Sequence, residues 1–297
     1  MDVKSRCLTS WRSDTMFAMA LRKMAEPPAS VLAAFQLTAP VRPLAGGQGQ
    51  SFRAGDAVLK PVDSREEAEW AARVFADLSA TAEFRVPRPF RSREGAYVVE
   101  GWTASEFLVG QEGPAEKWVS LIASSRALHR ELRHVPRPGL LDRRADPWAA
   151  ADRVAWGEVS SLRSANADEL LVRLGELKGP VEAPSQLIHG DLTGNVLFQP
   201  GQPPAVIDFS PYWRPVSYAE AIVVADGLLY HHAGPELIEA VLPGREGLQM
   251  LVRALIFRLA TLAIWAGQGE MVPQEELTRF AGVTRVVEDR MRVALTD

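Results

Sequence analysis

Residues 189–198 read HGDLTGNVLF, and Val206 begins the tetrapeptide VIDF. This stretch contains three oxygen-bearing side chains, those of Asp191, Asn195 and Asp208, beside short apolar runs. Carboxylate and amide oxygens are ligands that a hard divalent cation accepts, and a carboxylate can also take a proton from a reacting hydroxyl. The pattern therefore indicates a site for metal binding and proton transfer, provided that the fold brings the three side chains together.

A β-hairpin is the element that would bring them together. Residues 196–198 and 205–207 are apolar and flank QPGQPP, whose proline and glycine content is typical of a turn. If the two runs pair antiparallel about this turn, Asn195 falls opposite Asp208, with the Cα atoms about 4.5–5.5 Å apart. The sequence thus predicts both residues at one place, with Asp191 close by in the preceding loop.

Each of these residues also has a simpler interpretation. An isolated Asp or Asn beside a turn is more often an Asx turn or a helix cap than a catalytic group. Three such side chains at one strand edge are harder to explain in this way, and the grouping favours the chemical interpretation.

A second set of chemical groups lies in the first third of the chain. The glycine-rich turn GGQGQS, residues 46–51, falls between two predicted strands, where its backbone can offer N–H groups to a polyanion. Lys60 ends the next strand, and Glu67 lies at the leading edge of the following predicted helix as a candidate ion-pair partner. Glu69 is a less suitable partner because it does not share the apolar face of that helix. Each signal alone is weak, since most glycine-rich turns are simple hairpins and most exposed lysines are solvated.

The elements that must position these groups fall into two parts. Strands are predicted before residue 109, around a helix at 65–78 and after a short helix at 30–37, and helical spacing dominates the rest of the chain apart from the hairpin. We therefore predict an α+β fold. Its segments are an N-terminal extension at 1–26, a small antiparallel β-sheet lobe with one helix at 27–109, and a larger, mainly helical lobe at 110–297.

The individual predictions are these. Helices are expected at 30–37, 65–78, 118–132, 148–162, 169–177, 219–230 and 248–266. Two strands are expected at 86–92 and 96–110, the second long and bent at Gly101.

The composition disfavours several classes of function. The 297 residues are 47% hydrophobic and carry a net charge of −4, which suits a globular protein and disfavours a basic nucleic-acid-binding surface. Cys7 is the only cysteine, so we expect neither disulfides nor a thiolate metal site, and a cytoplasmic location. We expect no membrane-spanning segment, because the apolar run at 254–266 is short and contains Arg258.

With these features the sequence resembles the aminoglycoside phosphotransferase and choline kinase group, relatives of the protein kinases. The resemblance covers residues 30–270, and HGDLTGN together with VIDF is its most specific part. The motifs VLKPVD and DFSPYWRP make the chain especially similar to an uncharacterised actinobacterial branch. The resemblance implies a protein-kinase-like fold of two lobes, which transfers the γ-phosphoryl group of ATP, with Mg²⁺, to a hydroxyl of a small molecule.

The resemblance also implies a nucleotide-binding role for the positions that match. The backbone that would cover the ATP phosphates belongs to Gly46, Gly47, Gly49, Gln50 and Ser51. Lys60 would hold the α- and β-phosphates while paired with Glu67. The segment that would pass the adenine ring is Glu106, Phe107 and Leu108.

In the catalytic segment, Asp191 would orient or deprotonate the acceptor hydroxyl, while Asn195 and Asp208 would hold Mg²⁺. His189 is interpreted as a structural residue that braces the loop. The aromatic residues 212–213 could wall an acceptor pocket, although packing is their simpler role.

Two departures from the group leave a second hypothesis open. Asp191 and Asn195 are four residues apart where relatives usually have five, and a brace of Gly-Asp-Pro and a further Asp is replaced by Arg214–Pro215 and Glu220. In the second hypothesis the chain is a nucleotide-binding pseudoenzyme that acts as a ligand-dependent interaction module. The presence of Lys60, Asp191, Asn195 and Asp208 favours the enzyme, with a small-molecule acceptor and neither nucleic acid nor membrane as a partner.

Overall fold

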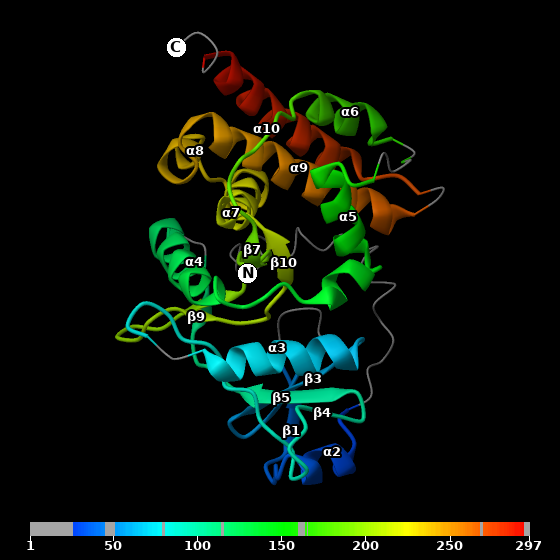
Figure 1. Ribbon diagram of the computed structural model, residues 1–297, viewed down its shortest axis with the longest axis vertical. Helices are drawn as coiled ribbons and strands as arrows, with labels where there is room; N and C mark the ends of the chain where they lie inside the picture. Colours follow the sequence, from blue (N-terminus) through cyan, green and yellow to red (C-terminus); the bar gives the residue numbers. More distant parts are fainter. Residues whose placement is uncertain are drawn as a thin grey trace, which may run out of the picture. The chain divides into compact units, whose positions relative to one another are not determined.

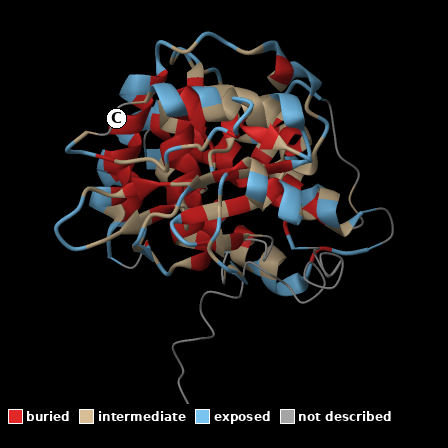
Figure 2. Cartoon of the chain, turned by 90° about the horizontal axis from the view of Figure 1, so that it is seen from below, coloured by how far each residue is buried: buried red, intermediate tan, exposed pale blue. Residues whose placement is uncertain are grey.

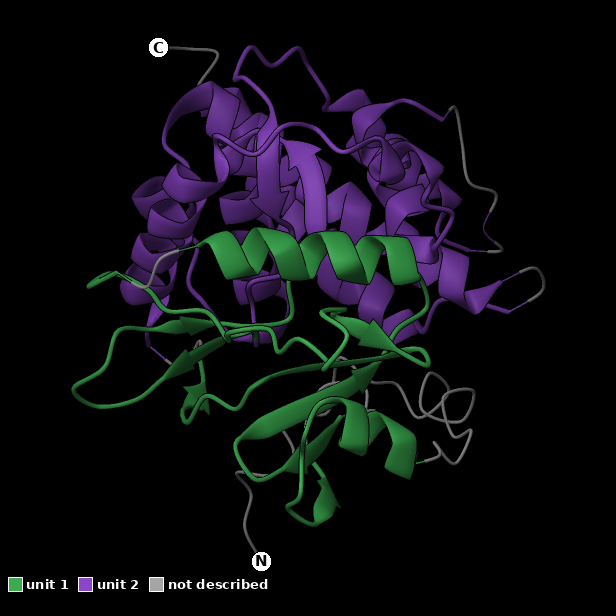
Figure 3. Cartoon of the chain, turned by 60° about the horizontal axis from the view of Figure 1, so that its bottom comes forward, with its two compact units in different colours: residues 1–113, 195–209 green, residues 114–194, 210–297 purple. Residues whose placement is uncertain are grey.

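The computed structural model describes residues 26–44, 51–78, 81–113, 116–159, 164, 166–267 and 270–293. The chain forms two compact units (Figure 3), a sheet unit of residues 1–113 and 195–209 and a helical unit of residues 114–194 and 210–297. The chain therefore passes from one unit to the other after Gly113, after Gly194 and after Phe209. The predicted N-terminal extension at 1–26 lies outside the described residues except for its last position.

The sheet unit is built on a five-stranded antiparallel sheet with the order β1-β2-β3-β5-β4 (Figure 1). Its strands are β1 (Val41–Pro43), β2 (Phe52–Ala54), β3 (Ala57–Pro61), β4 (Val98–Val99) and β5 (Trp102–Glu106). Because side chains alternate between the two faces of a strand, Leu59 packs into the core cluster with α2 (Ala29–Ala34), and Lys60 lies on the opposite face.

The helix α3 (Arg65–Asp77) confirms the helix predicted at 65–78. It begins at Ser64, whose side-chain oxygen accepts a hydrogen bond from the Glu67 N–H at 3.2 Å. This contact is an N-cap, which satisfies one of the N–H groups that a helix leaves unbonded in its first turn.

The two strands predicted after this helix were wrong in detail. Residues 96–110 form a hairpin of β4 and β5, because Glu100 and Gly101 both take positive φ values, 48° and 78°, and reverse the chain. Residues 86–92 form only an isolated bridge at Pro89, since the prolines in this segment lack the N–H that a regular ladder requires.

A second sheet in the same unit contains the predicted hairpin. Its strands, in the order β6-β8-β9, are β6 (Gln111–Glu112), β8 (Val196–Phe198) and β9 (Ala205–Val206). The backbone of Arg85 bonds to the residues on either side of Ala205, donating to Pro204 O and accepting from the Val206 N–H, each at 2.9 Å. The hairpin thus belongs to the sheet unit, whereas the predicted boundaries group it with the helical lobe at 110–297.

The helical unit is built around α9 (Gly244–Ala266), most of which is buried. Figure 2 shows the buried residues of the chain in red. The other elements are α4 (Trp118–Leu132), η2 (Gly139–Arg143), α5 (Pro147–Trp156), α6 (Asp168–Glu176), α7 (Val216–Tyr230), α8 (Glu236–Val241) and α10 (Gln274–Val293). In length and composition α9 could cross a membrane, but 89% of the relevant window is buried inside the protein. It is therefore the core helix of this unit, against which α5 and α7 pack.

A pair of antiparallel strands in the helical unit flanks the loop that contains Asp191. β7 (Gln186–His189) pairs with β10 (Pro211–Arg214), and His189 lies opposite Pro211. The Gly190 N–H donates to Ser210 O at 2.9 Å just beyond the paired residues. An antiparallel sheet unit with one long helix and a mainly helical unit confirm the predicted α+β class.

Candidate functional site

In the sheet unit, the predicted phosphate-binding lysine and a predicted metal ligand lie together. Lys60 Nζ forms an ion pair with Asp208 Oδ1. The two side chains are 35% and 37% exposed, so solvent reaches both charges. Asp208 has a φ of 53°, which turns the chain away from the direction of β9 at this residue.

Aromatic packing fixes the position of Asp208. The ring of the next residue, Phe209, lies 5.0 Å from Phe75 and 6.2 Å from Trp70, measured between ring centroids, and both of these rings belong to α3. Phe209 is therefore anchored to α3, and Asp208 is anchored to β3 through Lys60.

The two glutamates considered for Lys60 have different positions. Glu69 accepts hydrogen bonds at Oε1 from the N–H groups of Tyr97 and Val98, at 3.1 and 3.0 Å, so it ties α3 to β4. Glu67 lies in the first turn of α3. Its pairing with Lys60 remains a prediction.

The other predicted nucleotide contacts are only partly described. Gly46, Gly47, Gly49 and Gln50 lie outside the described residues, while Ser51 accepts a hydrogen bond at its carbonyl oxygen from the Leu44 N–H at 2.8 Å. In the adenine segment, the N–H of Glu106 donates to Arg88 O and that of Phe107 donates to Asp56 O, at 2.8 and 2.7 Å. The backbone of this segment is thereby fixed within the unit.

The predicted hairpin register was wrong by one residue. Val196 pairs with Val206, and the Ile207 N–H donates to Asn195 O at 2.9 Å. Asn195 therefore lies opposite Ile207, and Asp208 comes one residue after the position predicted for it.

Distant residues hold the hairpin and its turn. Pro203 and Pro204 have no N–H groups, and their carbonyl oxygens accept from Nε and the backbone N–H of Arg85, at 3.0 and 2.9 Å. Ala205 pairs with Leu197, whereas Phe198, its predicted partner, pairs with Gln111 of β6.

In the helical unit, His189 braces the loop that carries Asp191, as predicted. Its Nδ1 accepts from the N–H groups of Asp191 and Ser210, at 3.2 and 3.4 Å. Gly190 is required here, because a Cβ atom at this residue would lie 2.4 Å from Tyr212 Cδ2. The loop therefore lies directly against the Tyr212 ring.

A second histidine supports this strand from behind. His129 on α4 accepts from the His189 backbone N–H at Nε2, at 3.0 Å, and its Nδ1 lies 3.3 Å from Ser125 Oγ. Burial, followed by the neighbouring imidazole of His189, lowers the pKa of His129 to about 3. His129 is thus a neutral core residue.

An arginine that the sequence analysis did not single out holds Asp191. Arg258 on α9 is 3% exposed, and its Nη2 donates to Asp191 Oδ1 at 2.9 Å. The same guanidinium donates to both carboxylate oxygens of Asp226 on α7, at 2.8 and 2.6 Å. Asp191 itself is 42% exposed, so its carboxylate is held in one orientation and remains accessible.

The electrostatics of this group keep the arginine charged. Burial alone would lower the pKa of Arg258, but the carboxylates of Asp226 and Asp191 raise it well above its ordinary value. In the sequence, Arg258 and Asp226 lie inside the apolar helices 248–266 and 219–230. Charges are rarely buried unless they are paired, so these two residues were the signal that could have indicated the contact.

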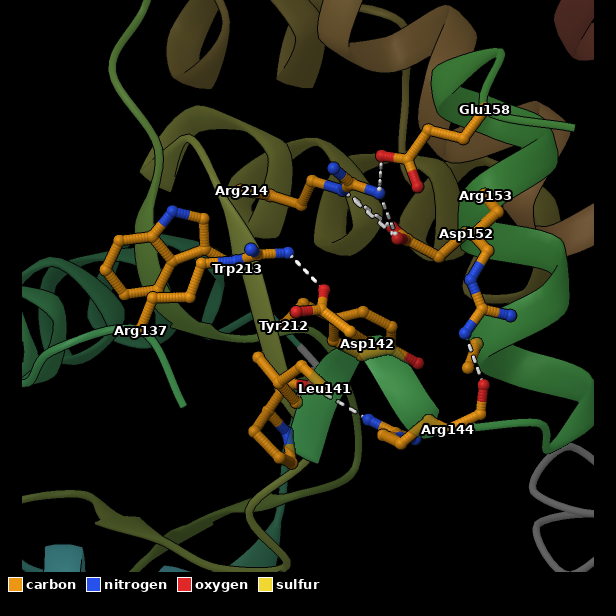
Figure 4. A pocket seen from close by; sticks show the side chains of 12 residues that line it. Arg137, Leu141, Asp142, Arg144, Asp152, Arg153, Glu158, Tyr212, Trp213 and Arg214 are labelled. Atoms are coloured by element: carbon orange, nitrogen blue, oxygen red, sulfur yellow. Dashed lines mark hydrogen bonds and ion pairs between the residues drawn. The ribbon is translucent and has the colours of Figure 1, made fainter. Parts of the chain in front are cut away.

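A pocket of about 270 Å³ opens in the helical unit beside the same loop (Figure 4). Tyr212 and Trp213 of β10 line one side of it, and residues of η2 and α5 line the others. Tyr212 is 7% exposed and packs against Gly190. The aromatic pair therefore has both of the roles considered for it, packing and forming the wall of a pocket.

The donor set fits a magnesium ion that is held jointly with phosphates. Asn195 and Asp208 offer hard oxygen atoms, and among the described residues no group of three or more His, Cys, Asp or Glu side chains could hold a metal by itself. Mg²⁺ usually binds through one or two carboxylates together with substrate phosphates and water. The residues present are consistent with that mode of binding.

Comparison with known proteins agrees with this arrangement. The profile of the phosphotransferase enzyme family matches residues 40–212, which is more than half of the chain. A comparison with curated proteins gives no significant match.

Several solved structures have a similar fold. Choline kinase LicA from Streptococcus pneumoniae superposes with a TM-score of 0.55 at 13% identity, over 87% of this chain and 96% of that one. A thermostable mutant of aminoglycoside phosphotransferase APH(4)-Ia, in its apo form, gives 0.56 at 14% identity, over 87% and 97%. A choline/ethanolamine kinase family protein from Mesorhizobium loti gives 0.54 at 16%, over 93% and 94%. At these identities the similarity establishes a protein-kinase-like fold.

Proposed function

The chain belongs to the phosphotransferase enzyme family, and we propose that it transfers the γ-phosphoryl group of ATP to a hydroxyl group of a small molecule. The observation that carries this proposal is the ion pair of Lys60 and Asp208. Both charges are solvent-accessible. Phosphates bind a lysine and Mg²⁺ binds a carboxylate, so these two ligands could replace the ion pair. The APH(4)-Ia enzyme has been crystallised with ADP and hygromycin B, which supports nucleotide binding in this fold.

In the proposed reaction, Lys60 binds the α- and β-phosphates, and the glycine-rich turn at 46–51 covers them with backbone N–H groups. Asn195 and Asp208 hold Mg²⁺, which neutralises phosphate charge when it is bound. The N–H groups of Glu106 and Phe107 are already bonded. We therefore propose that the N–H of the next residue, Leu108, donates to the adenine ring.

Asp191 accepts the proton of the acceptor hydroxyl as that oxygen attacks the γ-phosphorus atom. Arg258 holds one carboxylate oxygen, Oδ1, and so orients the other for the hydroxyl. His189 fixes the backbone of the loop by accepting from the Asp191 N–H. Arg258 and His189 are positioning residues in this scheme, because neither acts on the substrate directly.

Isothermal titration with ATP and Mg²⁺ tests the nucleotide site. We expect Lys60→Met to weaken binding at least several-fold, because a charge-assisted contact to phosphate is lost. The control is Lys117→Met, which removes the same charge from the helical unit and should bind ATP as the unchanged protein does. Equal affinity for Lys60→Met and Lys117→Met would remove Lys60 from the proposed site.

The short spacing between Asp191 and Asn195 favours a second candidate, a nucleotide-binding pseudoenzyme whose ligand-dependent surface contacts a partner. A screen of ATP consumption against hydroxylated metabolites, nucleosides, amino alcohols and antibiotics separates the two. Phosphoryl transfer to any acceptor that depends on Asp191 supports the enzyme. Tight ATP binding without transfer to any of them supports the pseudoenzyme.

A further inference from the structure

The pocket beside Tyr212 has an unusual lining for a protein of net charge −4. Four arginines reach it from separate positions along the chain and surround the central space in Figure 4. They are Arg137, Arg144, Arg153 and Arg214. Guanidinium groups repel one another, so a cluster of them needs counter-charges or an anionic ligand.

Carboxylates balance three of the four. Arg137 pairs with Asp142 at 2.5 Å, and Arg144 pairs with Asp146 at 2.9 Å. Arg214 pairs with two acids, Asp152 at 2.6 Å and Glu158 at 2.7 Å.

Arg153 on α5 is the exception. Among the described residues its guanidinium has one hydrogen-bond acceptor, the carbonyl oxygen of Arg144. A guanidinium carries five N–H donors in a planar fork that matches a carboxylate or a phosphate. Arg153 lines the pocket and is only half-buried, so its remaining donors are accessible from the pocket.

A fifth arginine adds positive charge behind the pocket wall. Arg253 is 7% exposed and lies on one side of the Trp156 ring, 5.1 Å from the centroid, with Arg214 4.8 Å away over the same ring. Its Nη atoms donate to the carbonyl oxygens of Gln249 and Gly179, which carry no charge. Five guanidinium groups therefore lie among four carboxylates, and the surplus charge is positive.

We infer that this pocket binds the acceptor through an anionic group, a carboxylate or a phosphate, with Arg153 as its anchor. The part of the inference that concerns the acceptor rests on the proposed phosphotransferase function. Tyr212 connects the two sites, because its ring lines the pocket and also packs against Gly190, the residue before Asp191. An acceptor held by its anion in the pocket can thus present a hydroxyl toward Asp191. A cationic acceptor would meet surplus positive charge.

Binding to the full chain without ATP tests the inference separately from the reaction. The probes are glycerate and glycerol 3-phosphate, with glycerol and choline as neutral and cationic counterparts of similar size. The readout is the indole N–H resonance of Trp213, assigned by its loss in Trp213→Phe. We expect saturable shifts with the two anions and none with glycerol or choline. Shifts with choline as large as those with the anions, or none with either anion, would overturn the inference.

Variants then locate the anchor. Arg153→Gln should weaken binding of the anionic probes by roughly tenfold or more, because charge-assisted hydrogen bonds are lost. Arg279→Gln on α10 removes the same charge from another part of the helical unit and should bind them unchanged. Unaltered binding in a folded Arg153→Gln protein would refute its role. If that variant does not fold, Arg137→Gln at the pocket rim, where the side chain is 51% exposed, tests the positive charge of the pocket instead, and unaltered binding of the anionic probes would refute the inference.

The titrations also separate this inference from the proposed function. Binding of ATP and Mg²⁺ with no anion binding at Trp213 overturns the inference alone. Anion binding that depends on Arg153, without any binding of ATP, overturns the proposed function and leaves the anion site in place.

Discussion

The two units hold their charged groups in contrasting ways. In the sheet unit, Lys60 and Asp208 form a single ion pair whose side chains are each about one-third exposed. In the helical unit, Arg258 is nearly fully buried and is shared between Asp191 and Asp226. Exposed pairs contribute about 0–1 kcal/mol to stability, whereas removal of one partner from a buried pair costs about 3–5 kcal/mol.

This difference separates groups that exchange partners from groups that stay fixed. The Lys60–Asp208 pair costs little to open. In the proposed function, phosphate therefore replaces Asp208 as the partner of Lys60, and the metal replaces Lys60 as the partner of Asp208. Arg258 cannot leave Asp226 without exposing a buried charge to an apolar interior. We therefore propose that the sheet unit binds the nucleotide and that the helical unit fixes the orientation of Asp191, the proposed proton acceptor.

The largest expected effect is on turnover. Asp191→Ala should lower the rate of phosphoryl transfer by about 10² to 10⁴, the usual range for a positioned acid or base. ATP affinity, measured by isothermal titration, should remain nearly the same, because the proposed nucleotide contacts belong to the sheet unit. Turnover equal to that of the unchanged protein, on an acceptor found by screening, would show that Asp191 has no catalytic role.

The next effect is on stability. Arg258→Ala should lower the free energy of unfolding by about 3–5 kcal/mol, because a buried carboxylate at Asp226 loses its counter-ion. Lys60→Met in the exposed pair should change it by at most about 1 kcal/mol. Urea denaturation of both variants gives the comparison, and equal losses would contradict the distinction between the two units.

A double variant sharpens this test. Replacing the buried pair by apolar residues, as Arg258→Met with Asp226→Leu, should recover much of the stability lost in Arg258→Ala. Turnover should stay low in the double variant, because Asp191 no longer has the arginine that orients it. Full turnover in a stable double variant would remove Arg258 from the positioning role.

The sequence predicted what depends on neighbouring residues and missed what depends on distant ones. The strands around Lys60 follow from local patterns and were confirmed. The hairpin register was wrong, and the residues that bond to the hairpin from outside it, those of β6 and Arg85, lie far from it in the sequence. Arg258 was missed as the partner of Asp191 because 67 positions separate them, and periodicity alone does not place a helix against a loop.

Another prediction uses the histidines, all five of which belong to the helical unit. The pKa of His129 is lowered to about 3 by burial, whereas an unfolded histidine titrates near 6.5. As the pH falls below 6.5 the unfolded state gains a proton and the folded state does not, so stability is lost. The loss from this residue reaches about 2 kcal/mol at pH 5.

His129→Gln should flatten this dependence. Free energies of unfolding measured in urea at pH 7 and pH 5 should differ less in the variant than in the unchanged protein, by about 2 kcal/mol. Because the effect concerns one unit, probes such as Trp148 or Trp265 in the helical unit should report it. An unchanged pH dependence in the variant would show that His129 is protonated in the folded protein.

The smallest expected effect concerns Gly194, one of the residues at which the chain passes between the units. Gly194 has a φ of 80°, and no atom would lie within 4 Å of a Cβ added there, so the cost of an alanine comes from the backbone alone. Gly194→Ala should destabilise the protein by about 1 kcal/mol, because side chains disfavour the left-handed region. Gly175→Ala in α6 is the matched control, since its Cβ also meets open space and an alanine in a helix should stabilise by about 0.5–1 kcal/mol.

Gly194 also lies between Asp191 and Asn195, which belong to different units, so we expect its variant to lose more turnover than 1 kcal/mol of stability explains. A fall in turnover no larger than that of Gly175→Ala would show that the spacing of the two residues tolerates change, and that the short loop is no obstacle to catalysis.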